Sequence, residues 1–162
     1  MVFLVEWVEI GRHVRRVKRK ILRISDVMTS TVVTIEIDDT LQTAKDIFDN
    51  TYFHHLPVVG DSTMSDGKLL GVVSDRDLLK VLSPNIGTAA ETLKDLSCLN
   101  KKVHQVMTRQ LITLEATADI YDAIAIFNRH RVSCIPIVDK SLVIQGILSW
   151  RDILKALERM RK

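Results

Sequence analysis

Short apolar runs alternate with polar turns and with stretches of helical periodicity along this chain, and one such pattern occurs twice. Residues 71–80 have the pattern of an apolar strand that passes through Ser74 into a short helix, and residues 146–155 repeat it with Ser149 at the same place. In both copies an aspartate follows the serine by three positions. Two copies of one pattern indicate a duplicated structural unit.

The repeat extends well beyond these two stretches. An offset of 79 places residues 27–59 on residues 106–138 without a gap, and each copy begins with Val-Met-Thr. From Gly71 and Gly146 onward the offset is 75, so the first copy has four additional residues. These must lie in residues 60–68, where Gly, Asp and Ser predict a turn that tolerates insertion.

Each copy predicts the same order of elements. A short strand, at residues 32–35 or 111–114, precedes a helix with an apolar stripe, and a strand that contains a proline follows. A turn, an apolar strand and a final helix complete a β-α-β-β-α unit. Because a unit of roughly 55 residues is too small to bury its apolar face alone, we expect both units to pack as one α/β domain with pseudo-two-fold symmetry.

The chain divides into four segments on this basis. They are an N-terminal extension (1–22), a first unit (23–82), a linker (83–102) and a second unit (103–158). A Ser-Pro-Asn-Ile-Gly run ends the first unit, and residues 89–99 predict a connecting helix within the linker.

The N-terminal extension carries most of the positive charge. Residues 1–24 hold seven basic and two acidic side chains, a net charge of +5, so the remaining residues carry −2 of the total +3. This distribution argues against a broad nucleic-acid-binding face on the body. Residues 2–8 predict a strand or an apolar dimer contact, and residues 12–23 predict an amphipathic basic helix. That helix packs on the body, or binds an anionic membrane or protein surface, or binds nucleic acid.

Composition excludes several classes of protein. Hydrophobic residues make up 46% of the chain, enough for a core, and the widely spaced Cys98 and Cys134 are typical of a reducing compartment. Because no apolar run approaches the roughly 18 residues of a membrane span and the start does not resemble a secretory signal, we expect a soluble cytoplasmic protein. Without a glycine-rich phosphate loop, a nucleophile elbow or closely spaced metal ligands, we expect neither an enzyme nor a metal site.

The duplicated motifs resemble a known family. Each copy has Val-Met-Thr, then a helix, then Leu-Pro-Val-Val or Ile-Pro-Ile-Val, and then Gly-Val-Val or Gly-Ile-Leu followed by Ser-x-Arg-Asp. This order, found twice, is similar to a tandem pair of CBS motifs, the arrangement called a Bateman module. The resemblance covers about residues 22–158. It implies a stand-alone CBS-pair protein that acts as a non-catalytic regulatory sensor and binds adenosine-containing ligands in clefts between the two motifs.

The resemblance also implies which residues bind the ligand. By position, the family's ribose-binding aspartate falls on Asp77 and Asp152, and its hydroxyl near the phosphate falls on Ser74 and Ser149. An ionised aspartate accepts hydrogen bonds from both hydroxyls of a ribose, and a helix N-terminus attracts phosphate. However, Ser-x-x-Asp before an apolar run is also a capping box, so a purely structural role remains open.

Basic and apolar positions complete the candidate site. The family's phosphate-reaching basic positions fall on His54 and His55 in the first copy but on Ser133 and Cys134 in the second, which predicts unequal affinities for charged nucleotides. Trp150, at the place of Asp75, predicts a packing or dimer contact. The base-framing candidates are Thr34, Ile35, Leu56, Pro57, Thr113, Leu114, Ile135 and Pro136. The basic candidates on the final helices are Arg76, Lys80, Arg151 and Lys155.

We therefore expect AMP, ADP or ATP as the ligand, with Mg²⁺ as an optional companion and no other cofactor. We expect a homodimer and an effector protein on another chain, and neither nucleic acid nor a membrane as the main partner. Two alternatives stay open. The chain is a dimerisation scaffold with vestigial clefts, or its basic N-terminal segment binds an anionic partner.

Overall fold

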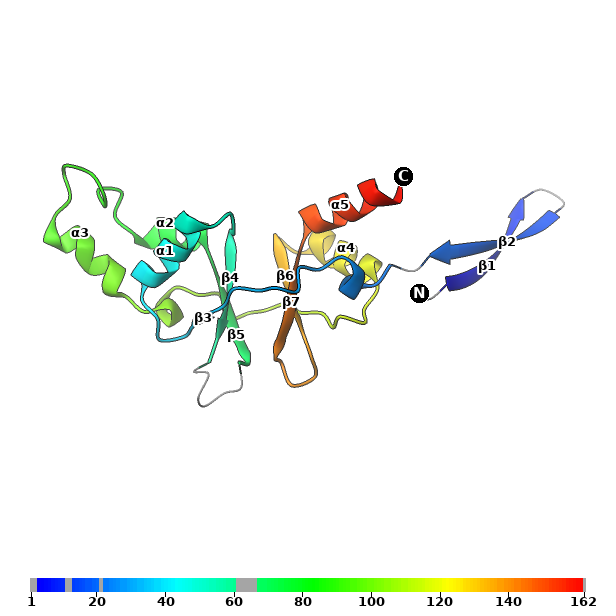
Figure 1. The fold of residues 1–162 in the computed structure, drawn as a ribbon, viewed down its shortest axis with the longest axis horizontal. Coiled ribbons are helices and arrows are strands. Elements are labelled where there is room, and N and C mark those ends of the chain that lie inside the picture. The colour runs from blue at the N-terminus through cyan, green and yellow to red at the C-terminus, as the bar shows by residue number, and fades with distance from the viewer. Residues whose placement is uncertain (1–2, 11–12, 21, 61–66, 162) are drawn as a thin grey trace.

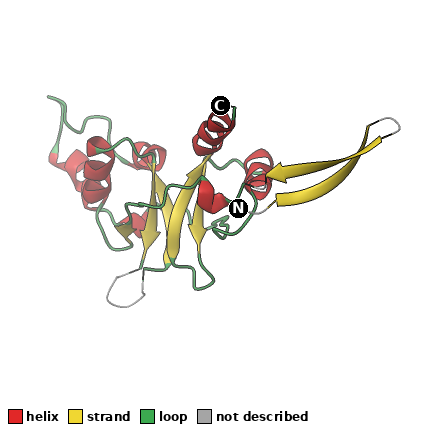
Figure 2. Ribbon diagram, turned by 45° about the vertical axis from the view of Figure 1, so that its right-hand side comes forward, coloured by secondary structure: helices red, strands yellow, loops and turns green. Residues whose placement is uncertain are grey.

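Two small sheets lie side by side at the centre of the molecule, and helices flank each of them (Figures 1 and 2). The computed structural model describes residues 3–10, 13–20, 22–60 and 67–161. The strands are β1 (Phe3–Ile10), β2 (His13–Lys20), β3 (Ile35–Glu36), β4 (His55–Val59), β5 (Leu69–Ser74), β6 (Cys134–Val138) and β7 (Ile144–Ser149). The α-helices are α1 (Leu41–Asn50), α2 (Asp75–Val81), α3 (Leu93–Ser97), α4 (Ile120–Arg129) and α5 (Trp150–Met160).

Each half of the body has the predicted β-α-β-β-α order. In the first half, β3 pairs in parallel with β4, which pairs antiparallel with β5, and α1 and α2 accompany this sheet. In the second half, Leu114 makes a single parallel bridge to Ile137, and β6 pairs antiparallel with β7 beside α4 and α5. The α/β class and the pairing of two related units are therefore confirmed.

The first strand of each unit is shorter than the prediction of residues 32–35 and 111–114. The structure has the two-residue strand β3 in the first unit and a single bridge at Leu114 in the second. The apolar pattern overstates these strands because the backbone just before each of them pairs with the other half instead. Thr29 forms an antiparallel bridge with Ile147.

The beginning of each sequence copy packs into the half formed mainly by the other copy. Ile24 is fully buried in the second core, with Ile120, Ile135 and Leu148. Its amide donates to the carbonyl of Ala118 at 3.0 Å. The two copies are therefore interlocked rather than merely placed side by side.

The reciprocal exchange has the same geometry. Val103 and Met107, at the start of the second copy, are buried in the first core with Leu41 and Leu56. The amide of Thr108 donates to the carbonyl of Val72 at 2.9 Å. Each half therefore buries apolar side chains that come from the other sequence copy. Neither copy has a complete hydrophobic core by itself.

A glycine in each half makes this exchange sterically feasible. A Cβ added at Gly146 would lie 2.6 Å from the Met28 sulfur and 3.0 Å from the Thr29 carbonyl oxygen. A Cβ at Gly71 would lie 2.5 Å from the Met107 sulfur. Each Val-Met-Thr triplet thus crosses a strand where a side chain is absent.

The N-terminal extension forms an antiparallel hairpin that reaches away from the body (Figure 1). Of the two alternatives for residues 2–8, the strand is confirmed over residues 3–8, since β1 covers Phe3–Ile10, and residue 2 lies outside the described residues. The predicted helix at residues 12–23 is wrong, because β2 covers His13–Lys20. The valines of residues 13–20 fit a strand as well as a helix, and β1 supplies every residue of β2 with a partner, from Phe3 opposite Lys20 to Ile10 opposite His13. A dimer contact through this segment stays a prediction.

The linker contains a shorter helix than the predicted one at residues 89–99. α3 begins only after Thr92, whose hydroxyl donates to Asp95 at 2.6 Å while the amide of Asp95 donates back at 3.3 Å. Ser83 donates to the same carboxylate at 2.6 Å. Hydrogen bonds from Ser83 and Thr92 lower the pKa of Asp95 to about 2. The residues before Thr92 stay non-helical because this capping box fixes where the helix starts.

The four additional residues of the first copy fall between Gly60 and Lys68, mostly outside the described residues. No helix among the described residues has the length and apolar character needed to cross a bilayer.

Replacing Gly146 with alanine is expected to destabilise the fold by about 1 to 3 kcal/mol, the usual effect of overpacking. The new methyl group would meet Met28 and the backbone of Thr29. Urea unfolding followed by circular dichroism measures the change in the free energy of unfolding. In a double-mutant cycle with Met28→Ala, G146A should lower the free energy of unfolding by less than it does in the wild type, because the Met28 sulfur is no longer present to clash. An unchanged free energy of unfolding in G146A would contradict the close crossing.

Candidate functional site

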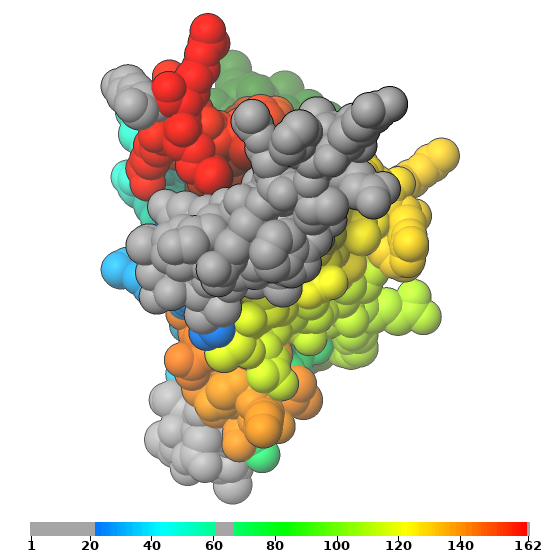
Figure 3. All heavy atoms as spheres, turned by 90° about the vertical axis from the view of Figure 1, so that its right-hand side faces the viewer, coloured from blue at the N-terminus to red at the C-terminus, as the bar shows by residue number. Residues whose placement is uncertain are grey.

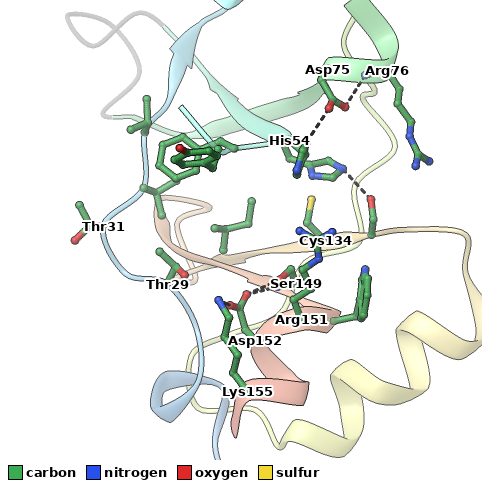
Figure 4. A pocket seen from close by; sticks show the side chains of 18 residues that line it. Thr29, Thr31, His54, Asp75, Arg76, Cys134, Ser149, Arg151, Asp152 and Lys155 are labelled. Atoms are coloured by element: carbon green, nitrogen blue, oxygen red, sulfur yellow. Dashed lines mark hydrogen bonds and ion pairs between the residues drawn. The ribbon is translucent and has the colours of Figure 1, made fainter. Parts of the chain in front are cut away.

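A cavity of about 490 Å³ opens where the two halves meet, beside the first turns of α2 and α5 (Figure 4). Its walls come from Thr29, residues 31–33, residues 52–55, the start of α2, residues 133–134 and the junction of β7 with α5. Both sequence copies therefore contribute to one site. Its volume is within the range of about 300 to 1,000 Å³ that is usual for small-molecule pockets.

Asp152 lies in this cavity on the first turn of α5. Its Oδ2 accepts hydrogen bonds from the Ser149 amide at 2.9 Å and from the Ser149 hydroxyl at 2.6 Å (Figure 4). Its Oδ1 lies 4.0 Å from the Lys155 ammonium. Among the described residues no donor hydrogen-bonds to this Oδ1. The serine thus fixes the aspartate and leaves one oxygen available to a ligand hydroxyl.

Asp77, the counterpart of Asp152, accepts hydrogen bonds through both of its carboxylate oxygens. Its Oδ2 accepts from the Ser74 hydroxyl at 2.6 Å, and its Oδ1 accepts from the Lys80 ammonium at 2.9 Å. Partial burial acts to raise the pKa of this carboxyl, but hydrogen bonds from Ser74 and Lys80 outweigh it, so the pKa of Asp77 is lowered. Asp77 does not line the cavity. Both Ser-x-x-Asp pairs are thus capping boxes, and the described cavity opens at only one of them.

Two histidines line the cavity, His54 just before β4 and His55 as the first residue of β4. The Nδ1 of His54 lies 2.8 Å from Oδ2 of Asp75, so the imidazole donates to the carboxylate (Figure 4). The Nε2 of His55 lies 2.8 Å from the hydroxyl of Ser133, on the other sequence copy. Burial lowers the pKa of His55, and His54 lowers it further, although Asp75 acts to raise it. Burial also raises the pKa of the Cys134 thiol to about 12, so this group is uncharged.

Three basic side chains line the same cavity. Arg76 comes from the start of α2, and Arg151 and Lys155 come from the start of α5. The Arg151 guanidinium lies 5.5 Å from the centre of the Trp150 ring, which orients it by a cation–π contact. With Asp75 and Asp152 as the described carboxylates of the lining, the cavity has a net positive charge.

Sequence comparison identifies the two units. The profile of the CBS domain matches residues 24–84 and 103–159, which together make up most of the chain. The chain belongs to the CBS domain family. An uncharacterized protein of Methanocaldococcus jannaschii is 33% identical over 136 residues, covering 84% of this chain and 40% of that protein. This chain spans between 24% and 40% of the length of the first curated relatives that it matches.

Solved CBS structures share this fold. CBSX2 in complex with AMP has a TM-score of 0.71 and 23% identity, covering 86% of this chain and 98% of CBSX2. The CBS domain pair of protein MJ0100, in complex with 5′-methylthioadenosine and S-adenosyl-L-methionine, has a TM-score of 0.69 and 22% identity, covering 87% of this chain and 99% of that pair. At these identities the likeness establishes the architecture of the CBS pair.

The structure brings part of the predicted site together and leaves the rest elsewhere. The predicted residues that line the cavity are His54, His55, Arg76, Ser133, Cys134, Ser149, Arg151, Asp152 and Lys155. The predicted residues buried in the sheets are Ile35, Leu56, Pro57, Ile135 and Pro136. Thr113 and Leu114 line a second, more open cavity of about 680 Å³, and Thr34, Ser74, Asp77 and Lys80 line neither. The side chains of the five residues in the sheets are buried, so a role of these positions in framing a base stays a prediction.

Several lining residues were not predicted from the sequence. Trp150, predicted as a packing or dimer contact, lines the cavity with 47% of its surface exposed. The other additions are Thr29, Thr31, Val32, Val33, Tyr52, Phe53, Asp75 and Ile147. The aromatic pair before His54 is a signal that could have been used, since the second copy has Arg and Val at the equivalent places.

Replacing Asp77 with alanine is expected to lower the free energy of unfolding by about 1 kcal/mol at pH 7, the usual effect of losing a helix cap. Because the pKa of Asp77 is lower in the folded state, its stabilisation is complete above the unfolded pKa of about 4 and is lost as the pH falls through the folded pKa. The difference between wild type and D77A in urea unfolding should therefore shrink below pH 4. Ser74→Ala should show a similar loss, and a pH-independent difference would contradict this role.

Proposed function

We propose that this CBS pair is a regulatory module that binds an adenine nucleotide, AMP, ADP or ATP, in the cavity beside Asp152 and does not transform it. The observation that carries the proposal is the placement, in one cavity, of an apolar wall, a carboxylate with an available oxygen and a group of cations. These features match the base, the ribose and the phosphates of a nucleotide.

The apolar wall suits a flat base. Val32, Val33, Phe53 and Ile147 line the cavity, and Val33 and Phe53 are exposed by 39% and 42%. In Figure 4 the segment that carries Thr29 and Thr31 lies on the side of the cavity away from Arg151. A base placed there would cover apolar surface and gain stacking with the aromatic ring, a contribution of about 1 to 3 kcal/mol.

The carboxylate suits the ribose. Asp152 accepts from Ser149 through Oδ2, so Oδ1 can accept from a ribose hydroxyl without breaking the helix cap. A hydrogen bond to a charged acceptor contributes about 1.5 to 3 kcal/mol. The two roles that the sequence left as alternatives, capping and ligand binding, are thus compatible in one side chain.

The cations suit the phosphates. Arg76 and Arg151 reach the cavity from the first turns of two helices, and Lys155 reaches it from the second turn of α5. Helix N-termini also favour anions. Arg76 belongs to the first motif and Arg151 to the second. A phosphate bound between them would hold the two motifs in one arrangement, which is the differential interaction that a regulatory ligand needs.

Differences between the copies favour a single strong site. The first copy contributes Tyr-Phe-His-His at residues 52–55 to the Asp152 cavity, whereas the second copy has Arg-Val-Ser-Cys at residues 131–134. Lys80 also engages Asp77 more closely than Lys155 engages Asp152. We therefore propose that the Asp152 side binds first. Relatives in complex with AMP and with S-adenosyl-L-methionine support an adenosine-containing ligand for the family fold.

Asp152→Ala is expected to weaken AMP binding by about 10- to 100-fold, the equivalent of one charge-assisted hydrogen bond. Asp77→Ala is the matched control, because it removes the equivalent aspartate from a position outside the cavity. Isothermal titration calorimetry measures both dissociation constants, and mass spectrometry of the recovered AMP checks that it is unchanged. Equal losses in D152A and D77A would refute the single-site assignment. If AMP, ADP, ATP and S-adenosylmethionine all fail to bind the wild type, the scaffold alternative is favoured.

We further propose that a second copy of the chain covers the outer face of α5. Trp150, Leu154, Leu157 and Met160 follow one another at helical spacing and are exposed by 47% to 54%. The C-terminal part of this helix stands at the surface in Figure 3. Leu79, the counterpart of Leu154 on α2, is exposed by 77%. Because the pseudo-two-fold duplicates this apolar feature, a second copy offers a matching surface.

Leu154→Asp is expected to convert the dimer to a monomer, because the substitution places a charge in the centre of the apolar face. Sedimentation velocity at several protein concentrations measures the change. Leu93→Asp is the control, since Leu93 is 88% exposed and its helix α3 lies at the other end of the body from α5 (Figure 1). A wild-type protein that stays monomeric at high micromolar concentration would refute the proposal.

A further inference from the structure

We propose that His55 makes anion binding in the Asp152 cavity take up a proton, so that the site prefers phosphorylated over unphosphorylated adenosine more strongly as the pH falls. The inference rests on the proposed function, because it concerns the phosphate end of the same site. In this proposal His55 distinguishes phosphorylated adenosine ligands from those without a phosphate.

His55 is placed between the two motifs rather than at the outer surface. It is the first residue of β4, it lines the cavity, and its Nε2 lies 2.8 Å from the Ser133 hydroxyl of the other motif. Its neighbour His54 also lines the cavity, but the imidazole of His54 is hydrogen-bonded to Asp75. His55 is therefore the described histidine of the lining that has no carboxylate partner.

Charges surround His55 from every side of the cavity. Asp75, Arg76 and Asp77 belong to α2, and Arg151, Asp152 and Lys155 reach the cavity from α5. Without a ligand, burial and the neighbouring His54 and Arg76 oppose the charged imidazole, and Asp75 and Asp77 compensate only in part. The histidine is therefore neutral near pH 7.

A bound phosphate reverses this balance. A phosphate monoester carries close to two negative charges at pH 7, and an opposite charge within a few ångströms favours the imidazolium. The pKa of His55 in the complex would then exceed its value without ligand. Binding therefore takes up a proton between these two pKa values, and affinity rises as the pH falls through that interval.

The contact with Ser133 supplies a geometric reason for the coupling. When His55 is protonated, its Nε2–H donates to the Ser133 oxygen, so the serine hydroxyl can turn its own hydrogen toward a phosphate oxygen. When His55 is neutral with Nε2 unprotonated, the serine donates to the histidine instead. Protonation thus converts one internal hydrogen bond into a donor for the ligand.

The test compares AMP with 5′-methylthioadenosine, which has no phosphate, by calorimetry at pH 6.5 and pH 8. Buffers of low and high ionisation enthalpy are used at each pH, because the difference in heat counts the protons taken up. We expect AMP to bind about two- to fourfold more tightly at pH 6.5, since a shift of one pKa unit reaches tenfold only well below both pKa values. The affinity for 5′-methylthioadenosine should not change.

The phosphate of AMP itself titrates near pH 6, so the decisive quantity is the difference between wild type and His55→Asn. The variant should bind AMP with a smaller pH dependence and less proton uptake. His130→Asn is the matched control, because His130 is exposed at the end of α4 and lies outside the cavity. Ser133→Ala is a second variant that keeps the imidazole and should reduce the preference for AMP at pH 6.5.

The outcomes separate this inference from the proposed function. AMP binding with the same proton uptake in wild type and H55N would overturn the role of His55 and leave nucleotide binding in place. The same pH dependence for 5′-methylthioadenosine as for AMP would also overturn it, since no phosphate is then involved. No binding of either ligand at either pH would overturn both proposals.

Discussion

The reciprocal crossing of two Val-Met-Thr segments over two glycines is the constraint on which the rest of this structure depends. Met28 and Thr29 lie against Gly146, and Met107 lies against Gly71, at distances that leave no space for a Cβ. The crossing fixes one half against the other by buried contacts and backbone hydrogen bonds. Residues 29–33 are thereby held beside the first turn of α5, where they form one wall of the cavity.

The interlocked arrangement also explains how a duplicated unit can form an asymmetric site. A Ser-x-x-Asp capping box begins the final helix of each half, and the backbone at Ser74 and Ser149 has nearly the same conformation. The two copies differ in the residues before β4 and β6 and at the first helical residue, and these differing residues line the cavity beside the cap of α5. The duplication therefore accounts for the shared backbone of the two halves, and the side chains that differ between the copies account for the character of the cavity.

The helix α5 connects the cavity with the outer surface. Trp150 lines the cavity and also begins the exposed apolar face that continues through Leu154 and Leu157. Arg151, the next residue, also lines the cavity. A ligand and a partner copy would thus contact the same short helix, which gives binding in the cavity a direct physical route to the assembly.

The sequence by itself determined the duplication, the β-α-β-β-α order and the capping boxes, because these depend on local periodicity and on residues three positions apart. It could not determine that residues 12–23 would pair with β1, since a few valines fit either a strand or a helix. Nor could it determine which aspartate faces a cavity. Ile35, Leu56 and Ile135 have the same apolar character whether they frame a ligand or fill a core, and only the packing of one half against the other decides between these roles.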